Sequence, residues 1–477
     1  MSEVVRFGSK VRALRRRDGL SQAELATRLG VSASYLNLIE NNKRPLPAPL
    51  LVKLAQELKV DIAQFASDED ARLVSDLMEA FADPMFADPA LTQAEVRDMA
   101  SASPAAARAV IALYRAYRAA KGSADDLSSR IAERDDLAQG ATPAHLPSEE
   151  VSDFIQRNQN HFAGLETGAE ELLARGKLHT DEIYQGLVRY LEGELGISVQ
   201  IARSEKARET LRRFEPHEKT LSLSELLPTR SRSFQLAYQI GMLTQKSAIG
   251  ALVDRDAYLT TDASRALARV ALGNYFAGAV LMPYEAFLRA AREERYDIDV
   301  LGRRFRVGFE QTCHRLTTLR RAGAEGVPFH FVRIDVAGNI SKRFSASGIR
   351  IARFSGACPR WNIFAAFLTP GMIRIQLSRM PDGEAFFCLA RTIQKDSGGY
   401  HAQQPVMAIG LGCKLEHAKE LVYSDGVDLE NPGICTPVGV TCRTCERADC
   451  DQRAFPSMRQ PLVVDENVRG TSLYSIR

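Results

Sequence analysis

The first 312 residues contain no cysteine, and all eight cysteines of the 477-residue chain lie beyond that point. So uneven a distribution in a long chain argues against a disulfide framework, which is typical of small secreted domains. No run of eighteen apolar residues exists, so no transmembrane helix is predicted. The N-terminal MSEVVRFGSK has no apolar segment of a signal peptide, and we expect a cytoplasmic protein with no membrane partner.

Tryptophan and nucleotide-binding signatures are also scarce. Trp361, in ACPRWNIFAAF, is the only tryptophan, and it either packs in a core or stacks on an adenine ring. No GxGxxG is present, which excludes the dinucleotide-binding fingerprint.

Acidic residues are few at the N-terminal end of the chain. Residues 1–60 carry eleven Lys and Arg but five Asp and Glu, a net charge of +6, against +3 for the whole chain. Such a basic end attracts nucleic-acid phosphates.

The stretch Leu20–Arg44 predicts a helix-turn-helix. Ser21 and Glu24 have the spacing of a capping box, Gly30 favours the end of the first helix, and Ser32 is suited to cap the second. The alternative is an ordinary helical hairpin with a solvated polar face. The segment resembles the phage-repressor (Cro/C1 or XRE) family, in which a five-helix domain binds an operator as a dimer. The resemblance implies base contacts from Gln22, Ser32, Ala33, Ser34 and Asn37, and phosphate contacts from Arg17, Tyr35, Asn41, Lys43 and Arg44.

The length predicts about three domains. We expect a mainly α multidomain protein with an α+β C-terminal part. Its predicted parts are a five-helix DNA-binding domain (1–66), a helical connector or dimerisation layer (67–122), a linker with some helical periodicity (123–150), a zincin-like degenerate peptidase domain (151–322) and an α+β sensor domain (323–477).

Residues 180–320 resemble the ImmA/IrrE metallopeptidase-like domain, chiefly through RSFQLAYQIGM and GNYFAGAVLMP. Active members carry HExxH, in which two His bind zinc and the Glu is the general base. The corresponding residues here are Tyr238, Gln239 and Met242, and Val270 stands near the expected third ligand. An amide cannot deprotonate water at neutral pH. We therefore expect no peptidase activity, and either a ligand pocket, a structural hub or a vestigial domain in its place.

The C-terminal part predicts hairpins, with turns at Gly338–Asn339 and Pro381–Gly383. Near the end, Cys435, Cys442, Cys445 and Cys450 lie within sixteen residues and include a Cys-x2-Cys pair. This spacing is typical of structural zinc, and an iron–sulfur cluster is an alternative. Four free thiols, or a redox role, are the other interpretations. The isolated Cys313, Cys358, Cys388 and Cys413 are interpreted as core thiols.

The repressor-type head, the degenerate peptidase segment, PRWNIFAAF, IQLSRMPDGEAFFCLARTI and CRTCERADCDQRAFP together resemble the short-chain fatty acyl-CoA regulators over nearly the whole chain. The resemblance implies a bacterial transcription factor of propionyl-CoA-type metabolism that binds double-stranded operator DNA as a homodimer or higher oligomer. It also implies a short-chain acyl-CoA effector for the C-terminal region, where Trp361, Arg374, Arg379 and Arg391 are candidate ligand-binding residues. Two other hypotheses remain: a metal- or redox-sensing regulator that uses the cysteine cluster, and a zinc peptidase that cleaves a repressor.

Overall fold

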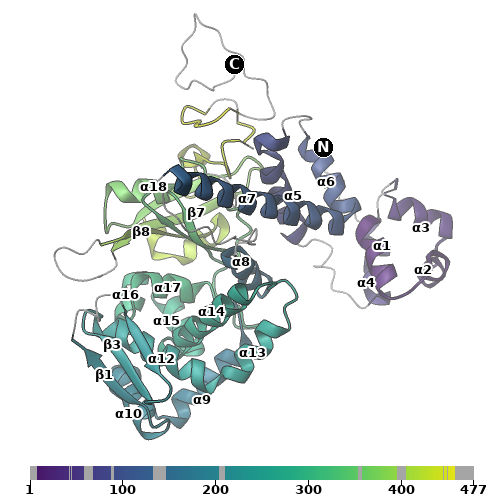
Figure 1. Cartoon of the computed structure of the whole chain (residues 1–477). Coiled ribbons are helices and arrows are strands. Elements are labelled where there is room, and N and C mark those ends of the chain that lie inside the picture. The colour runs from purple at the N-terminus through teal and green to yellow at the C-terminus, as the bar shows by residue number, and fades with distance from the viewer. Residues whose placement is uncertain are drawn as a thin grey trace, which may run out of the picture.

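The computed structural model describes residues 8–41, 43–44, 46–58, 68–86, 91–132, 147–203, 210–352, 357–394, 404–443, 445–447 and 450–456. The chain is mostly helical up to residue 317, and its C-terminal part is built around a sheet (Figure 1). The predicted combination of a helical N-terminal part and an α+β C-terminal part is therefore confirmed at this coarse level.

The N-terminal head has a small apolar core of its own. Buried leucines at positions 25, 29, 36 and 54, together with Val11, form this core. Its helices are α1 (Gly8–Arg17), α2 (Gln22–Leu29), α3 (Ala33–Glu40) and α4 (Ala48–Glu57). The fifth predicted helix falls on residues 59–66, which lie outside the described part of the chain.

A helical connector follows the head. It comprises α5 (Asp68–Phe81), a 3-10 turn η2 (Pro84–Phe86), α6 (Gln93–Ala102) and the long α7 (Pro104–Ala132). Val74, Leu77, Val96, Ile111 and Tyr114 form its core. Because α7 extends to Ala132, the first part of the predicted linker is helical, and residues 133–146 lie outside the described part. In Figure 1 the connector lies between the purple head and the rest of the chain.

The middle region packs helices beside a small sheet. Its first elements are α8 (Pro147–Arg157), α9 (Ala163–Arg175), η3 (Thr180–Glu182) and α10 (Ile183–Gly193). The sheet has the order β1 (Ser198–Ala202), β3 (Thr220–Ser224), β2 (Arg212–Glu215), with β1 parallel and β2 antiparallel to β3. The remaining helices are α12 (Thr229–Thr244), α13 (Lys246–Asp254), α14 (Asp262–Leu281), α15 (Tyr284–Glu293), α16 (Ile298–Arg304) and α17 (Phe309–Leu316).

The C-terminal part is a six-stranded sheet of order β5-β4-β8-β7-β6-β9, antiparallel except for the pair β6 and β9. The strands are β4 (His330–Asp335), β5 (Ile340–Ser345), β6 (Arg374–Arg379), β7 (Ala385–Gln394), β8 (Val406–Lys414) and β9 (Thr436–Pro437). Both predicted hairpins, β4–β5 and β6–β7, are confirmed, with Gly338 and Gly383 at positive φ in their turns. The helical elements are α18 (Asn362–Ala365), η4 (Ala366–Leu368), η5 (Leu415–Glu420), η6 (Val422–Ser424) and η7 (Pro432–Ile434).

The two faces of this sheet belong to different cores. Side chains alternate between faces along a strand, so Phe331, Leu389 and Leu411 join the core of the middle region. Val332 and Cys388 point to the opposite face, where a separate core includes residues of α18. The middle region and the sheet therefore share one continuous core, whereas the α18 side is a distinct layer.

Candidate DNA-binding surface and ligand cavity

The turn of the helix-turn-helix is fixed by local hydrogen bonds. The Glu24 amide donates to Ser21 Oγ at 3.2 Å, and the Ser21 amide donates to Glu24 Oε2 at 2.7 Å. Gly30 ends α2 at φ 71°, which favours glycine. Ser32 Oγ accepts from the Tyr35 amide at 3.1 Å and begins α3. The predicted caps are confirmed.

Most of the residues predicted to contact DNA are at least partly exposed. Ser32, Ala33, Ser34, Asn37, Asn41, Lys43 and Arg44 are exposed, and Gln22 and Tyr35 are half-buried. Asn37 Oδ1 accepts from Gln22 Nε2 at 3.3 Å and from Asn41 Nδ2 at 2.7 Å, while Arg44 lies over the Tyr35 ring at 5.1 Å. The Arg17 side chain lies outside the described part. These contacts hold the polar side chains of α2 and α3 together on the exposed side of the pair.

A buried acidic residue, which the sequence did not single out, holds this surface in place. Glu40 is 2% exposed and ends α3. Arg15 of α1 donates to both of its carboxylate oxygens, at 2.7 and 3.0 Å, and Gln22 donates a third hydrogen bond at 3.0 Å. The hydrogen bond to Glu40 raises the pKa of Arg15. Arg15 therefore serves to fix α1 against α3, and its charge is already paired.

The position of a zinc-peptidase centre is filled by side chains. Tyr238 and Gln239 of α12 are buried, and the Arg212 guanidinium stacks 3.8 Å from the Tyr238 ring centroid. A Cβ added at Gly273 would lie 2.8 Å from both Met242 Sδ and Tyr238 Cε2. An aromatic ring and a thioether therefore pack against α14 where active members hold a metal. None of these groups is a suitable zinc ligand.

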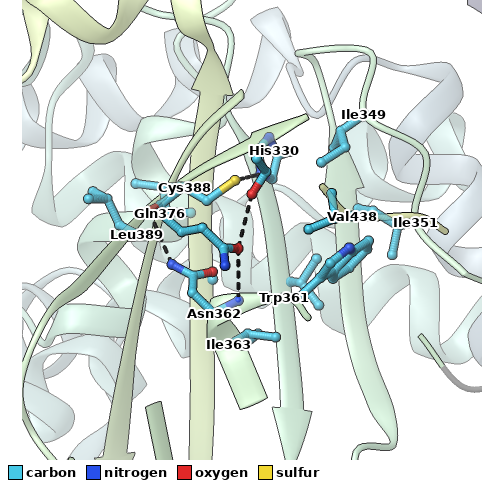
Figure 2. A pocket seen from close by; sticks show the side chains of 14 residues that line it. His330, Ile349, Ile351, Trp361, Asn362, Ile363, Gln376, Cys388, Leu389 and Val438 are labelled. Carbon is cyan, nitrogen blue, oxygen red and sulfur yellow. Dashed lines mark hydrogen bonds between the residues drawn. The ribbon is translucent and has the colours of Figure 1, made fainter. Parts of the chain in front are cut away.

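A second kind of site lies on the α18 face of the six-stranded sheet (Figure 2). The sheet cavity, as we call it, has a volume of about 30 Å³. A single water molecule needs about 10–15 Å³, so the cavity takes a group of only a few atoms. Its walls come from four strands, from α18 and from the segment after β5, and include His330, Val332, Ile349, Ile351, Trp361, Asn362, Ile363, Gln376, Cys388 and Gly410.

Long-range strand pairing brings the cavity residues together. His330 lies opposite Gly412 in the β4–β8 ladder, and a Cβ at Gly412 would approach His330 Cε1 to 2.5 Å. Glycine at this position therefore makes room for the imidazole. His330 Nδ1 lies 2.8 Å from Ser347 Oγ, and Nε2 lies 3.8 Å from Cys388 Sγ. Desolvation lowers the pKa of His330 to about 3, so the ring is neutral at physiological pH.

The four predicted ligand-binding residues are not gathered at one place. Trp361 lines the sheet cavity and donates from Nε1 to the Gly439 carbonyl at 2.9 Å. Arg374 is exposed and shares the face of β6 with Gln376, because alternate residues of a strand point the same way. Arg379 donates to Cys435 Sγ at 3.5 Å. Arg391 points to the other face, where it pairs with Asp299 at 2.7 Å.

The cysteines form a grouping that differs from the predicted one. Cys358, Cys442, Cys445 and Cys450 line one small cavity, whereas Cys435 does not line it. The Ala454 amide donates to Cys442 Sγ at 3.5 Å, and Arg360 Nη1 lies 4.0 Å from Cys450 Sγ. In the described part of the chain, no three His, Cys, Asp or Glu side chains are close enough to hold an ion. Cys358, interpreted from the sequence as a core thiol, is buried in the core on the α18 side and also lines this cavity.

One segment joins the sheet cavity to the connector. The Ser345 carbonyl at the end of β5 accepts from Arg72 of α5 at 2.8 Å and from Gln156 of α8 at 3.0 Å. The Ser345 amide donates back to Gln156 Oε1 at 3.0 Å. Two residues further on, Ser347 contacts His330, and then Ile349 and Ile351 line the cavity. The cavity residues Ile349 and Ile351 therefore lie only a few residues along the chain from Ser345, which is bonded to helix α5 of the connector.

The helix-turn-helix head and the small cavity in the C-terminal sheet indicate a DNA-binding transcription regulator with a second, separate site. Residues 11–65 match the helix-turn-helix family, residues 192–317 the IrrE N-terminal-like domain, and residues 318–474 the C-terminal region of short-chain fatty acyl coenzyme A regulators. The chain belongs to the short-chain fatty acyl coenzyme A regulator family, since relatives described below are 40% or more identical along almost all of it.

The names of two such relatives describe them as regulators. The "Propionyl-CoA carboxylase regulator" of Cereibacter sphaeroides is 42% identical and covers 100% of both chains. The "HTH-type transcriptional regulator PrpR" of Mycobacterium tuberculosis is 40% identical over 98% of this chain and 95% of the relative. A solved structure of a Mycobacterium tuberculosis transcriptional regulator matches 69% of this chain and 100% of its own, with 43% identity and a TM-score of 0.66.

These relatives are regulators and not enzymes, which agrees with the loss of the HExxH residues. The IrrE-like segment is thus a degenerate peptidase-like domain within a regulator. In the described part of the chain, no single helix is long and apolar enough to cross a membrane; α14 and α15 meet the test only as a pair bent by 66°.

Proposed function

We propose that a short-chain acyl-CoA binds the C-terminal part of this regulator, with its acyl group in the sheet cavity, and thereby changes the affinity of the head for operator DNA. The observation that carries the proposal is the sheet cavity itself, which is apolar, enclosed by α18 and large enough for a few atoms only. Such a cavity suits a short acyl group, while the bulky coenzyme stays outside. A related protein is named as the regulator of propionyl-CoA carboxylase, an enzyme whose name gives a short-chain acyl-CoA as its substrate.

Arg374 is the strongest of the three predicted arginines as a partner for the coenzyme phosphates. It is exposed and lies on the same face of β6 as the cavity residue Gln376. Among the described residues, its guanidinium has one hydrogen-bond contact, a long one of 3.4 Å from Nη1 to Thr369 Oγ1. Arg379 and Arg391 are already engaged with Cys435 and Asp299. A guanidinium binds phosphate oxygens in a bidentate manner.

A shift of the segment between Ser345 and Ile351 would transmit ligand binding to the DNA-binding head. Ligand that presses on Ile349 or Ile351 shifts the contacts of Ser345 with Arg72 and Gln156, and so biases the orientation of the connector. A ligand can shift an equilibrium only by its difference in affinity for the two states. The head would present Gln22, Ser32, Ala33, Ser34 and Asn37 to bases, and Arg17, Tyr35, Asn41, Lys43 and Arg44 to phosphates.

Binding of an operator would use two copies of the chain. One exposed strip of α7 is apolar, with Leu113 72% exposed and Ala105, Ala109 and Ala112 beside it, while Arg108 is exposed at the edge of the strip. We propose that two connectors pack there. Light scattering of the wild type and of Leu113→Glu tests this: a dimer that becomes a monomer supports the proposal, and a wild-type monomer that remains one on DNA contradicts it.

The sole tryptophan gives a direct test of ligand binding. Because Trp361 lines the sheet cavity, its fluorescence should change when propionyl-CoA is added and should change less with free CoA. Calorimetry run in parallel reports binding at any site. Heat of binding without a change in Trp361 fluorescence would contradict the location, and no heat at all would contradict the effector.

A metal-dependent structural role is a second candidate function. We propose that Cys358, Cys442, Cys445 and Cys450 move together to hold zinc or an iron–sulfur cluster, in place of the predicted set that includes Cys435. In the described part of the chain these side chains are not close enough to hold an ion without such a shift. Their common cavity supports this set, as do N–H donors near two of the sulfurs, since such donors stabilise thiolates. Bound metal would brace the loop 438–453 against the segment that carries Trp361.

A further inference from the structure

We infer that the sheet cavity rejects acyl groups that carry a carboxylate, and that Ile363 and Gly410 are the residues that limit the length of the acyl group. This inference rests on the proposed function, because it specifies which acyl group occupies the cavity. Charge, hydrogen bonding and shape support it separately.

The first support is the absence of charge. None of the side chains that line the cavity in the described part of the chain is Lys, Arg, Asp or Glu. The one titratable base, His330, is fully buried, and desolvation lowers its pKa to about 3. A carboxylate in the cavity would therefore have no cation to pair with. An unpaired buried charge is strongly disfavoured.

The second support is that the amide nitrogens of Asn362 and Gln376, and Oε1 of Gln376, are already engaged. Asn362 Nδ2 donates to the carbonyls of Arg374 and Cys388 at 3.0 and 3.1 Å. Gln376 Oε1 accepts from the Asn362 amide at 3.1 Å and from Ser378 Oγ at 3.0 Å (Figure 2). Gln376 Nε2 donates to the Arg360 carbonyl at 2.9 Å. The surface offered to a ligand is accordingly apolar, which suits an aliphatic group.

The third support is the close approach of α18 to the sheet. Ile363 is 3% exposed, and a Cβ added at Gly410 would lie 3.1 Å from Ile363 Cδ1. The isoleucine side chain therefore fills the space that the glycine leaves, and closes this side of the cavity. A longer acyl chain would have to displace Ile363 or the strand, and overpacking of this kind is costly.

The test is a set of Trp361 fluorescence titrations of the full-length protein with propionyl-, butyryl-, hexanoyl- and succinyl-CoA and with free CoA. We expect succinyl-CoA to bind at least about 100-fold more weakly than propionyl-CoA, from the cost of an unpaired buried charge. Hexanoyl-CoA should bind about 10-fold more weakly than propionyl-CoA. Equal affinities for propionyl- and succinyl-CoA would overturn the charge selection.

Two variants test the cause of the selection. Ile363→Ala should improve hexanoyl-CoA binding about 10-fold relative to propionyl-CoA, whereas Leu368→Ala, an 80% exposed neighbour, should change neither. Ile351→Lys places a cation on a half-buried wall position and should improve succinyl-CoA binding relative to propionyl-CoA. Thermal unfolding confirms that each variant is folded. Unchanged ligand preferences in both folded variants would overturn the inference.

The same data separate this inference from the proposed function. If calorimetry detects no binding of any acyl-CoA, the proposed function itself fails and the inference fails with it. If every acyl-CoA binds and changes Trp361 fluorescence, but with no dependence on charge or length, the effector site stands and only the selection is overturned.

Discussion

The guanidinium of Arg72, in the connector, donates a 2.8 Å hydrogen bond to the backbone carbonyl of Ser345 in the six-stranded sheet. The two residues are far apart in the sequence, yet this contact links the element after the DNA-binding head to the strand that leads into the sheet cavity. The chain runs from Ser345 to Ser347, which contacts His330, and then to the cavity residues Ile349 and Ile351. Removal of the Arg72–Ser345 hydrogen bond should therefore break the link between the cavity and the connector.

Replacing Arg72 by Ala should uncouple ligand binding from DNA binding. We expect propionyl-CoA affinity to stay within about 2-fold, while the ligand-induced change in DNA affinity falls by about 3- to 10-fold, the range of a coupling free energy of roughly 1 kcal/mol. Ligand and DNA titrations of the same sample measure both. Arg108→Ala, an exposed arginine of α7, is the matched control. A variant with full ligand response would show that the signal takes another route.

Asn37 and Lys43 should have different roles in DNA binding. Loss of a base contact in Asn37→Ala should cost about 1–3 kcal/mol on the preferred sequence and relax the preference. Loss of a phosphate contact in Lys43→Ala should weaken all sequences alike and lower the salt slope by about one. Salt titrations with preferred and scrambled DNA check both results. The assignment is wrong if Lys43→Ala alone changes the sequence preference.

Glu166 and Arg315 form a buried ion pair, with both side chains 2% exposed, that ties α9 to α17. Burial tends to raise the pKa of Glu166, but the Arg315 charge and the hydrogen bonds from Arg315 and Tyr275 outweigh it, so the pKa is lowered from 4.5. The stabilisation is therefore fully present above about pH 4.5 and is lost as the pH falls through the lowered pKa.

Glu166→Gln should lower the free energy of unfolding by about 3–5 kcal/mol at pH 7, because Arg315 remains buried without its partner. The difference from the wild type should shrink as the pH falls below the ordinary glutamate value. Urea denaturation at several pH values measures this. Glu171→Gln, an exposed residue of the same helix, should have almost no effect. A loss that is independent of pH would argue against the charged state of Glu166.

Serine variants should distinguish the cysteine set that includes Cys358 from the predicted set that includes Cys435. In Cys358→Ser and Cys450→Ser, the metal content of anaerobically purified protein should decrease, and so should its visible absorbance if the metal is an iron–sulfur cluster. Loss of one thiolate weakens a four-thiolate site. Cys435→Ser should keep the metal. Retention in Cys358→Ser with loss in Cys435→Ser would restore the set predicted from sequence spacing, and wild-type protein without metal would contradict both sets.

How far the sequence could predict these features depends on the range of the interactions. The helix-turn-helix was predictable because its signals are local: Ser21, Gly30 and Ser32 act within one helical turn. The hairpins at Gly338 and Gly383 were predictable for the same reason. The loss of the zinc site could also be read directly, because HExxH is a contiguous motif.

The cavity and the cysteine grouping could not be predicted in this way. His330, Gln376, Cys388 and Gly410 meet only because four strands pair in a particular order and register. Cys358 joins the C-terminal cysteines through a backbone hydrogen bond from its amide to the Val440 carbonyl. Nor does composition reveal that Arg391 faces Asp299 on the far side of the sheet. Contacts between residues that are so far apart in the chain leave no local pattern in the sequence.

The most direct test of the central claim is the affinity of the full-length protein for DNA selected from a random pool, measured by fluorescence anisotropy with and without saturating propionyl-CoA. The account predicts a change of about 5-fold or more, and no change with free CoA. In Gly410→Val, verified as folded by circular dichroism, the added side chain pushes Ile363 into the sheet cavity, and the response should disappear. Identical DNA affinity with and without ligand in the wild type, or an undiminished response in Gly410→Val, would contradict the account.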